Sequence, residues 1–381
     1  MPPGLVQLGA LSPHERSEAI REAAHTLARG GLVVFPTETA YGIGASAISG
    51  IDRFTAATGQ AGKDELAGGA GPFVWHTASL DPVLDLLRLD TPVARRLVRR
   101  LTPGPVQLVL NQPPEALAAV RERLGVAENI IDDGESLHVR VPDCAVAQTL
   151  LIECDFPVIA TLASAAAWAT ARTDTHGDPI LCVESDTDPG PDAVLNDGPT
   201  KHQATSTAVR IGLDGSFGVV RQGALHERDV MAALQRTVLF VCTGNTCRSP
   251  MARAIAQGLI DQEPPTGITT TARSAGVSAI EGAPASPPAL ETMHARGLDL
   301  TGHRSASLTP AMVDEADVVY TMTPSHAEAV MRLVPSAAHK VFPLDPTGLV
   351  HDPIGGPIDE YENTAARLEE LIRNRLRELN A

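Results

Sequence analysis

The chain has 381 residues, a net charge of −16, and 43% hydrophobic, 20% charged and 3% aromatic residues. This length predicts two or three domains, and the composition is typical of a soluble globular protein whose core is filled by aliphatic side chains. The negative charge argues against a broad nucleic-acid-binding face. A small anionic substrate is compatible with it, because local charge can oppose the net charge.

The cysteines argue against a secreted, disulfide-rich protein. They are five, an odd number, and no signal peptide is recognisable. No apolar run reaches the roughly 20 residues that a bilayer-spanning helix needs, so we expect no membrane partner. These observations together predict a cytoplasmic protein.

The first part of the chain, residues 1–230, is predicted to be one α/β domain. Apolar periodicity predicts helices at 15–29, 92–101 and 146–154. Strands are predicted at 31–35, 106–110, 136–141, 157–161, 204–212 and 218–221. Residues 170–200 are polar and contain several Asp, Gly and Pro residues, which predicts a long loop.

A second domain is predicted over residues 237–381, after a short helix at 224–236 that we interpret as the linker. Strands at 238–241 and 318–322 alternate with helices at 250–260, 325–333 and 359–379. Alternation of this kind predicts a doubly wound parallel sheet that is covered by helices.

The segment 238–250 reads VLFVCTGNTCRSP and carries the clearest chemistry. Five residues separate Cys242 from Arg248, so the intervening backbone N–H groups can curl around a phosphate at the start of a helix. The same field favours the thiolate form of Cys242. Arg248 offers a planar fork to two phosphoryl oxygens. Ser249 is predicted to cap the helix and to donate a hydrogen bond to the thiolate.

The whole loop is therefore a predicted phosphate-binding element, with Cys242 and Arg248 in catalytic roles. The residues predicted to bind the substrate are Thr243, Gly244, Asn245, Thr246, Cys247 and Ser249. A buried structural cysteine with an incidental arginine is the competing interpretation. The strand before the loop, Gly-Asn within it and Ser-Pro after it all disfavour that interpretation.

Asp352 is the candidate proton donor for the leaving group. It lies in the sequence HDPIGG at 351–356, where Gly and Pro shape a loop that can reach across the mouth of the cradle. By itself an Asp-Pro pair is a common turn. The surrounding sequence pattern is the reason to select Asp352 as the proton donor.

Residues 237–379 resemble the low-molecular-weight protein phosphatase family. The shared features are the Cys242 loop, SAG at 274–276, GHRS at 302–305, DVVYTM at 317–322, and Asp352-Pro353 before a final helix. The resemblance implies attack by Cys242 to form a phosphocysteine, protonation of the leaving group by Asp352, and stabilisation of the transition state by Arg248. It implies a phosphorylated protein as substrate, and neither metal nor cofactor.

Two departures from tyrosine-specific members bear on the substrate. Residues 354–356 read IGG where aromatic residues are typical, and Thr246 stands where a branched aliphatic residue is usual. Both features resemble the bacterial protein-arginine phosphatase branch, so we favour phosphoarginine, with phosphotyrosine as the alternative. For Cys247 two interpretations stay open: a reversible disulfide with Cys242, which would protect it from over-oxidation, or packing beneath the loop.

Residues 15–230 resemble the YrdC-like family of threonylcarbamoyl-adenylate synthases. The shared segments read FPTETAYG at 35–42, PGP at 103–105, VRVPD at 139–143, ST at 206–207 and RQGA at 221–224. The resemblance implies a twisted α/β sheet with a concave nucleotide-binding face. Its implied ligand residues are Thr39, Arg140, Ser206 and Arg221. It also implies ATP as a cofactor, a nucleotide or double-stranded RNA as ligand, and a role in tRNA modification.

The family's Lys-Gly-Arg-Pro segment is absent at the corresponding place. Residues 57–61 read ATGQA, and Lys63 is the cation nearest to them, while 162–165 reads LASA where the family has Ser-Ala-Asn. One hypothesis is a bifunctional enzyme whose first domain makes threonylcarbamoyl-adenylate from ATP, threonine and bicarbonate. The other is a diverged domain that binds a nucleotide, RNA or partner, or scaffolds the phosphatase.

Overall fold

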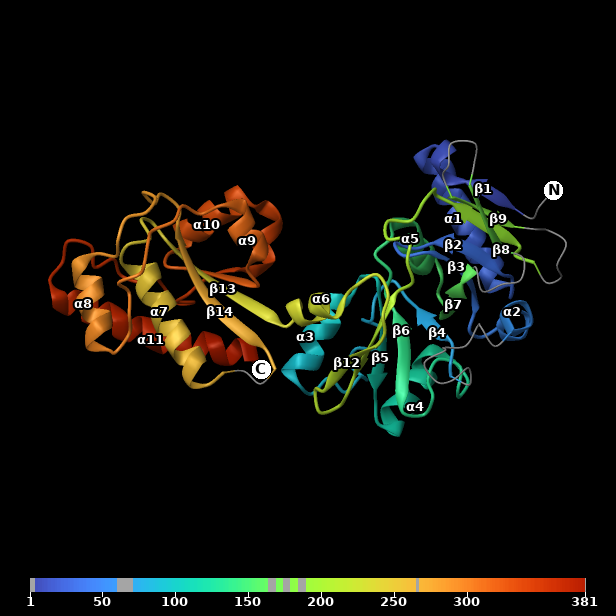
Figure 1. The fold of residues 1–381 in the computed structure, drawn as a ribbon, viewed down its shortest axis with the longest axis horizontal. Coiled ribbons are helices and arrows are strands. Elements are labelled where there is room, and N and C mark those ends of the chain that lie inside the picture. The colour runs from blue at the N-terminus through green and yellow to red at the C-terminus, as the bar shows by residue number, and fades with distance from the viewer. Residues whose placement is uncertain are drawn as a thin grey trace. The chain divides into compact units, whose positions relative to one another are not determined.

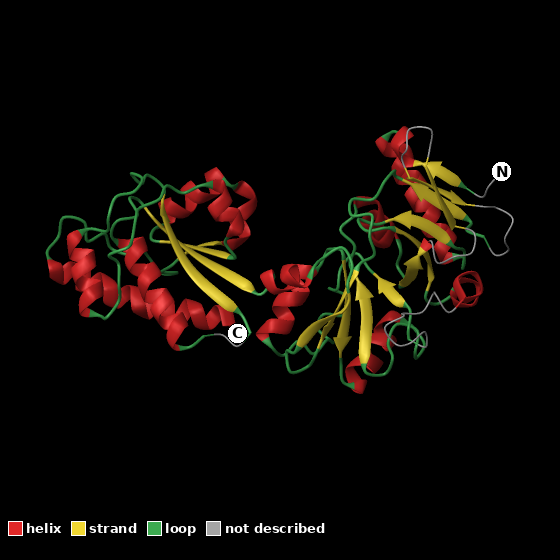
Figure 2. Ribbon diagram, in the orientation of Figure 1, coloured by secondary structure: helices red, strands yellow, loops and turns green. Residues whose placement is uncertain are grey.

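The computed structural model describes residues 4–59, 71–163, 169–173, 179–183, 190–264 and 267–380. The chain divides into two compact units, Met1–Ala233 and Leu234–Ala381. Figure 1 follows both from the blue N-terminus to the red C-terminus, and Figure 2 shows that each unit combines a sheet with covering helices. The predicted α/β class is confirmed for both units.

A mixed sheet forms the centre of the first unit. Within the described residues its strand order is β1-β10-β2-β3-β7-β4-β6-β5-β11-β12. Some neighbouring strands are parallel and others antiparallel: β4 and β6 are parallel, for example, whereas β5 and β6 are antiparallel. The strands are β1 (Leu5–Gln7), β2 (Val33–Pro36), β3 (Tyr41–Ser46), β4 (Val74–His76), β5 (Val106–Asn111), β6 (Ser136–Arg140), β7 (Val158–Leu162), β10 (Ala193–Asn196), β11 (Thr207–Ile211) and β12 (Phe217–Arg221).

Helices of the first unit pack on this sheet through apolar stripes. Leu27 of α1 and Leu150 of α5 share a core with Phe35 of β2. Helix α1 begins where Ser12 and Glu15 form a reciprocal capping box, a signal that is local in the sequence. The elements are η1 (Leu8–Ala10), α1 (Pro13–Ala28), α2 (Ile51–Thr58), α3 (Pro92–Leu101), α4 (Pro114–Leu124), α5 (Ala145–Glu153) and α6 (Glu227–Ala232).

The long loop predicted at 170–200 is wrong where the structure describes it, and residues 174–178 and 184–189 lie outside the described residues. Strands β8 (Ala169–Thr173) and β9 (Pro179–Val183) pair with each other in antiparallel fashion, and β10 joins the main sheet between β1 and β2. The Asp, Gly and Pro residues of this stretch suggested a loop because they disfavour strands locally. Strand β10 reads AVLN and contains none of these residues, so the composition of the whole stretch concealed a short strand that pairs with β2.

The second unit is a four-stranded parallel sheet with the order β14-β13-β15-β16, which confirms the predicted doubly wound arrangement. Alternate residues of β13 enter different cores. Phe240 packs with residues of α7, α8 and α11 on one face. Leu239 packs with residues of α9 and α10 on the other. The strands are β13 (Gln235–Cys242), β14 (Thr269–Gly276), β15 (Val318–Thr321) and β16 (Val341–Pro343).

The helices of the second unit connect these parallel strands. They are α7 (Arg248–Gln262), α8 (Pro287–Ala295), α9 (Pro310–Glu315), α10 (Pro324–Leu333), η5 (Pro335–Lys340) and α11 (Ile358–Asn380). The helix predicted at 224–236 is shorter than expected: α6 ends at Ala232, and Gln235 and Arg236 already belong to β13. Their pairing with Thr269 and Thr270 on β14 draws them into the sheet.

Candidate active site and candidate ligand site

Cys242 is the last residue of β13, and α7 begins six residues later at Arg248. Strand β13 lies between β14 and β15, so Cys242 stands at the carboxyl end of an interior parallel strand. That edge is where open α/β sheets bind ligands. Its neighbour in register is Gly276, where an added Cβ would lie 2.5 Å from the carbonyl oxygen of Thr243. Glycine at 276 therefore lets the loop lie against the end of β14.

The Cys242 sulfur is buried among hydrogen-bond donors. Its side chain is 2% exposed, and its Sγ accepts the backbone N–H of Asn245 at 3.3 Å. The Ser249 hydroxyl lies 2.9 Å from the same sulfur, as the sequence predicted. The prediction that Ser249 caps the helix is wrong: Cys247 occupies the N-cap position and Ser249 is the second helical residue. The helix therefore starts two residues earlier than predicted, at Arg248.

Asn245 holds the loop in shape. It is fully buried and has φ 55°, a left-handed conformation that Asn tolerates better than most residues. Its side-chain nitrogen donates to Ser249 Oγ at 2.8 Å, and its side-chain oxygen accepts the N–H of Ala306 at 3.0 Å. Its carbonyl oxygen accepts a hydrogen bond from Nε2 of His303 at 2.7 Å. Burial lowers the pKa of His303, and so do nearby arginines.

Arg248 and Asp352 form an ion pair across the mouth of the loop. Arg248 is 5% exposed, and its Nη1 donates to the carbonyl oxygen of Val350 at 3.3 Å. The Asp352 side chain is 40% exposed, so the pair has one buried and one accessible partner. The chain thus brings the predicted proton donor and the predicted cation together although they are 104 positions apart in the sequence.

The other predicted loop residues with side-chain or backbone contacts, Thr243, Thr246 and Cys247, contact His326, Ser286 and Tyr361. The Thr243 hydroxyl lies 2.9 Å from Nε2 of His326, and the Thr246 carbonyl accepts the N–H of Ser286 at 2.9 Å. Gly244 is half-buried. The Cys247 sulfur lies 3.2 Å from the Ser286 hydroxyl and 3.5 Å from that of Tyr361. These contacts show how the Cys247 side chain packs, and the reversible disulfide with Cys242 stays a prediction.

His326 is a residue that the sequence interpretation missed. It lies in the first turn of α10, where its N–H bonds the capping hydroxyl of Thr323. Burial lowers the pKa of His326, and the positive charge of Arg248 lowers it further. The imidazole is therefore neutral at pH 7, beside Thr243 of the loop. The only local signal was the capping sequence TPSH at 323–326, which predicts a helix start rather than a site.

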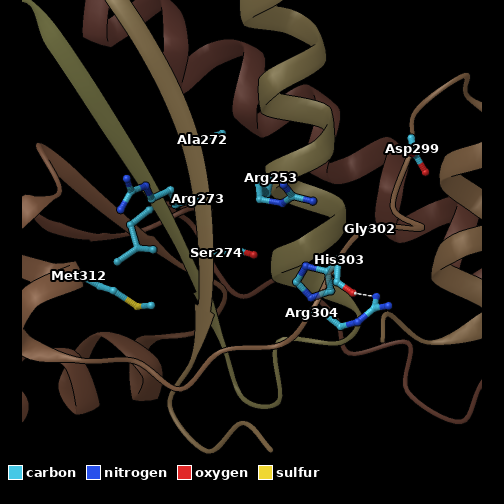
Figure 3. Close-up of a pocket in the computed structure, with 10 residues that line it drawn as sticks. Arg253, Ala272, Arg273, Ser274, Asp299, Gly302, His303, Arg304 and Met312 are labelled. Carbon is cyan, nitrogen blue, oxygen red and sulfur yellow. Dashed lines mark hydrogen bonds between the residues drawn. The ribbon is translucent and has the colours of Figure 1, made fainter. Parts of the chain in front are cut away.

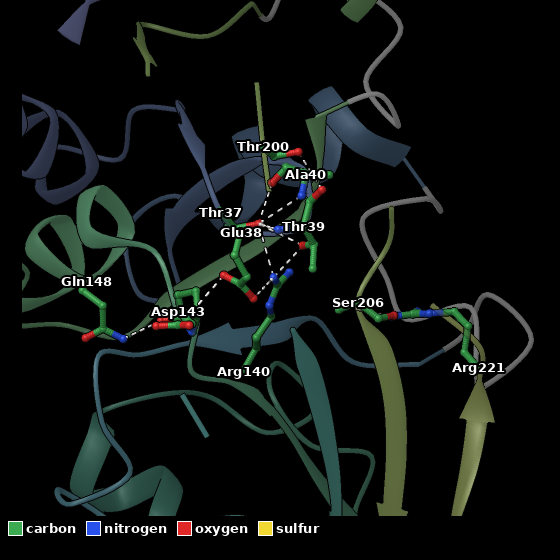
Figure 4. A network of polar contacts seen from close by, with 11 residues as sticks. Thr37, Glu38, Thr39, Ala40, Arg140, Asp143, Gln148, Thr200, Ser206 and Arg221 are labelled. Atoms are coloured by element: carbon green, nitrogen blue, oxygen red, sulfur yellow. Dashed lines mark hydrogen bonds and ion pairs between the residues drawn. The ribbon is translucent and has the colours of Figure 1, made fainter. Parts of the chain in front are cut away.

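In the first unit, Arg140 lies in a buried polar cluster with the predicted residue Thr39 (Figure 4). Its Nη2 lies 2.6 Å from Thr39 Oγ1, 3.2 Å from Thr37 Oγ1 and 2.8 Å from a carboxylate oxygen of Glu38. The other Glu38 oxygen accepts the N–H of Asp143 at 2.9 Å. Glu38 thus neutralises the cation, and sequence interpretation had missed that partner.

Ser206 and Arg221 form a second pair, away from the first in Figure 4. Arg221 Nη2 lies 3.4 Å from the Ser206 hydroxyl and 2.9 Å from Gln107 Oε1. Strand register joins the two pairs, because Arg140 faces Gln107, Gln107 faces Ala208, and Ala208 faces Arg221. Residues directly opposite on neighbouring strands point to the same face of a sheet. The two arginines therefore share one face, three strand spacings or roughly 14 Å apart.

Several residues of the family comparison lie outside the described residues. These are Gln60, Ala61, Lys63, Ser164 and Ala165. Among the residues that are described, no group of three or more His, Cys, Asp or Glu side chains is arranged to hold a metal. Over the same residues, no helix is long and apolar enough to cross a bilayer.

Two family models match the chain. The model for low molecular weight phosphotyrosine protein phosphatase matches residues 237–381. The Sua5, YciO and YrdC model, described as telomere recombination, matches residues 25–223.

Named relatives match each part of the chain separately. A protein-arginine-phosphatase of Bacillus subtilis is 39% identical over 37% of this chain and 95% of that protein. A probable low molecular weight protein-tyrosine-phosphatase EpsP of Ralstonia solanacearum is 35% identical over 36% of this chain and 91% of that protein. Threonylcarbamoyl-AMP synthase of Bacillus subtilis is 26% identical over 56% of this chain, which spans 56% of that protein.

Proposed function

Since the chain belongs through residues 237–381 to the low molecular weight protein phosphatases and through 25–223 to the Sua5, YciO and YrdC family, we propose that it hydrolyses phosphoarginine in proteins. The phosphatase class itself follows from the family. The proposal adds the substrate and the roles of the individual side chains in the Cys242 loop.

In the first proposed step, Cys242 Sγ attacks the phosphorus atom as a thiolate. Its hydrogen bonds from Asn245 N–H and Ser249 favour that ionised form. The phosphoryl group displaces Asp352 from Arg248, whose fork then binds two phosphoryl oxygens. On leaving Arg248 the Asp352 carboxylate takes up a proton from solvent; the S–P bond then forms as the P–N bond breaks, and Asp352 delivers that proton to the leaving guanidino nitrogen.

In the second proposed step, the phosphocysteine is hydrolysed. Asp352, now a carboxylate, takes a proton from water as the water oxygen attacks phosphorus. The P–S bond breaks, phosphate leaves, and Cys242 returns to the thiolate. Backbone N–H groups of the loop and Arg248 stabilise the charge on the phosphoryl oxygens in both steps.

The substrate proposal rests on the residues after Asp352. Ile354 is 69% exposed and the next two residues are glycines, with Gly355 at φ 78°. No aromatic side chain therefore stands in this described segment to pack against a phosphotyrosine ring. Asp352 already pairs with one guanidinium in the structure, which supports its use toward the guanidinium of a phosphoarginine. Thr246 adds a small polar side chain on the loop.

The test compares phosphate release from matched phosphoarginine, phosphotyrosine and phosphoserine peptides. We expect phosphoarginine to have the highest kcat/KM and Cys242→Ser to be inactive on all three. Thr246→Val should lower kcat/KM for phosphoarginine by about tenfold or more, because the polar group of the substrate that the Thr246 hydroxyl would contact is left without a partner. The kcat/KM for phosphotyrosine should change far less. Thr246→Ser is the matched control. Faster release from phosphotyrosine by the wild type would refute the substrate proposal and leave the phosphatase class intact.

For the first unit we propose ligand binding without synthase turnover. Residues 57–61 supply no cation in the sequence, and the cation at Arg140 is held by Glu38. Two lost charge-assisted contacts would weaken triphosphate binding by roughly 3–6 kcal/mol. Incubation with ATP, threonine and bicarbonate should release no pyrophosphate, while ATP should raise the melting temperature of this unit. Pyrophosphate release that Arg140→Gln abolishes would instead establish the bifunctional enzyme.

A further inference from the structure

A cavity of about 600 Å³ lies in the second unit, lined by residues of the β14 edge, α7 and the 299–304 segment. Its lining contains Arg253, Arg273 and Arg304 against one carboxylate, Asp299, a formal charge of 3 − 1 = +2. The cavity is therefore positively charged in a chain of net charge −16. The volume lies within the range of small-molecule sites, about 300–1,000 Å³.

Arg253 and Arg304 are not compensated by an ion pair within the described residues, whereas Arg273 pairs with Glu315. Within the described part of the chain, Arg304 donates to the carbonyl oxygens of Thr301 and His303. The Arg253 Nε–H is buried and has no acceptor among those same residues. Buried donors are rarely left unsatisfied, so a bound acceptor is a natural explanation. Asp299 is already engaged, because it accepts the N–H and hydroxyl of Thr301 at 2.7 Å.

The arginines are divided by strand β14 (Figure 3). Arg273 lies on the side of Met312 and pairs with Glu315 at 2.9 Å. Arg253 lies on the other side, with Ser274 and His303. Alternate residues of a strand point to opposite faces, which places Ser274 on the side of Arg253. The uncompensated cations, Arg253 and Arg304, therefore flank His303 on one side of the strand.

The same cavity touches the supports of the catalytic loop. His303 lines it and donates from Nε2 to the Asn245 carbonyl at 2.7 Å. Ser274 lines it and is followed by Ala275, whose carbonyl lies 3.3 Å from Ser249 Oγ. An anion placed between the arginines brings negative charge beside His303, which holds Asn245 and through it the donors around Cys242.

We propose that this cavity is a second anion site, that it binds a phosphorylated small molecule between Arg253 and Arg304, and that occupancy acts on the catalytic loop through His303. The cavity lies outside the catalytic loop and requires neither phosphoarginine nor phosphotyrosine as substrate. Its ligand is recognised by phosphoryl oxygens, which match the fork geometry of two guanidinium groups.

The binding test uses inorganic pyrophosphate as the probe and amide hydrogen exchange of the full chain as the readout. We expect protection of peptides covering 298–306, separate from protection of the catalytic loop. In the variant that combines Arg253→Gln with Arg304→Gln, protection of 298–306 should need a pyrophosphate concentration about 30-fold higher or more, because two charge-assisted contacts are lost. The exposed Arg304→Gln alone serves if the double variant does not fold. Arg332→Gln, an exposed arginine of α10, is the control.

The second test separates binding from coupling. Pyrophosphate should change both kcat and KM of the wild type, and only KM of the Arg253→Gln, Arg304→Gln variant, in which it competes at the catalytic loop alone. Equal protection of 298–306 in wild type and variant would overturn the site. Purely competitive inhibition of the wild type would overturn the action on the loop.

Discussion

Replacing Asn245 tests how the catalytic loop is held. Asn245→Ala removes the donor to Ser249 Oγ and the acceptor for the Ala306 N–H. The Ala306 N–H is left unpaired, which costs about 1–3 kcal/mol, and loss of the hydrogen bond to Ser249 Oγ, which keeps its contacts with Cys242 and Ala275, costs about 1 kcal/mol more. Alanine at φ 55° adds about 1 kcal/mol of backbone strain. We therefore expect Asn245→Ala to lower the unfolding free energy of the second unit by about 3–5 kcal/mol.

Asn245→Gly is the matched variant, because glycine loses the same two hydrogen bonds and tolerates a positive φ. It should be about 1 kcal/mol more stable than Asn245→Ala. Both should lower kcat more than they raise KM, since the donors around Cys242 lose their support.

The two tryptophans of the chain, Trp75 and Trp168, lie in the first unit. Urea unfolding of the second unit is therefore best followed by amide hydrogen exchange in peptides from 238–262, with phosphatase activity measured alongside. If both variants lost less than about 1 kcal/mol, Asn245 would not be a support of the loop and this reasoning would be wrong.

Two further predictions concern single side chains. Ser249→Ala removes the hydroxyl that lies 2.9 Å from Cys242 Sγ, so kcat should fall by about tenfold or more with little change in KM. Steady-state kinetics on an aryl phosphate measures both constants. An unchanged kcat would contradict a role for this contact. Burial, with a smaller contribution from the charge of Arg140, lowers the pKa of His76 to about 3. Unfolded His76 gains its proton near pH 6.5 and folded His76 does not, so the first unit should lose stability as the pH falls from 6.5 toward 3, by about 3 kcal/mol at pH 4. Urea unfolding followed by the tryptophan fluorescence of the first unit should show this slope, and His76→Gln should flatten it. An equal slope in both proteins would refute the assignment.

The polar residues of the first unit show what a motif can and cannot predict. Thr39 and Arg140 were selected from separate motifs, and the structure places them in contact although they are 101 positions apart in the sequence. Glu38 was missed as the partner of Arg140, because its sequence neighbours do not reveal which way its side chain turns. The row from Arg140 through Gln107 to Arg221 depends on the order and register of four strands, which periodicity does not encode.

By itself the sequence determined the strand, loop and helix around Cys242, because these are contiguous and held by contacts at short sequence separation. Asn245 N–H to Cys242 and Ser249 to Cys242 are separations of three and seven residues. Only the tertiary structure decided which distant residues complete the site. Asp352 reaches Arg248, and His303 reaches Asn245, through connections whose closure depends on the packing of helices on both faces of the parallel sheet. Local propensity carries no information about that packing, which is set by burial of the whole core.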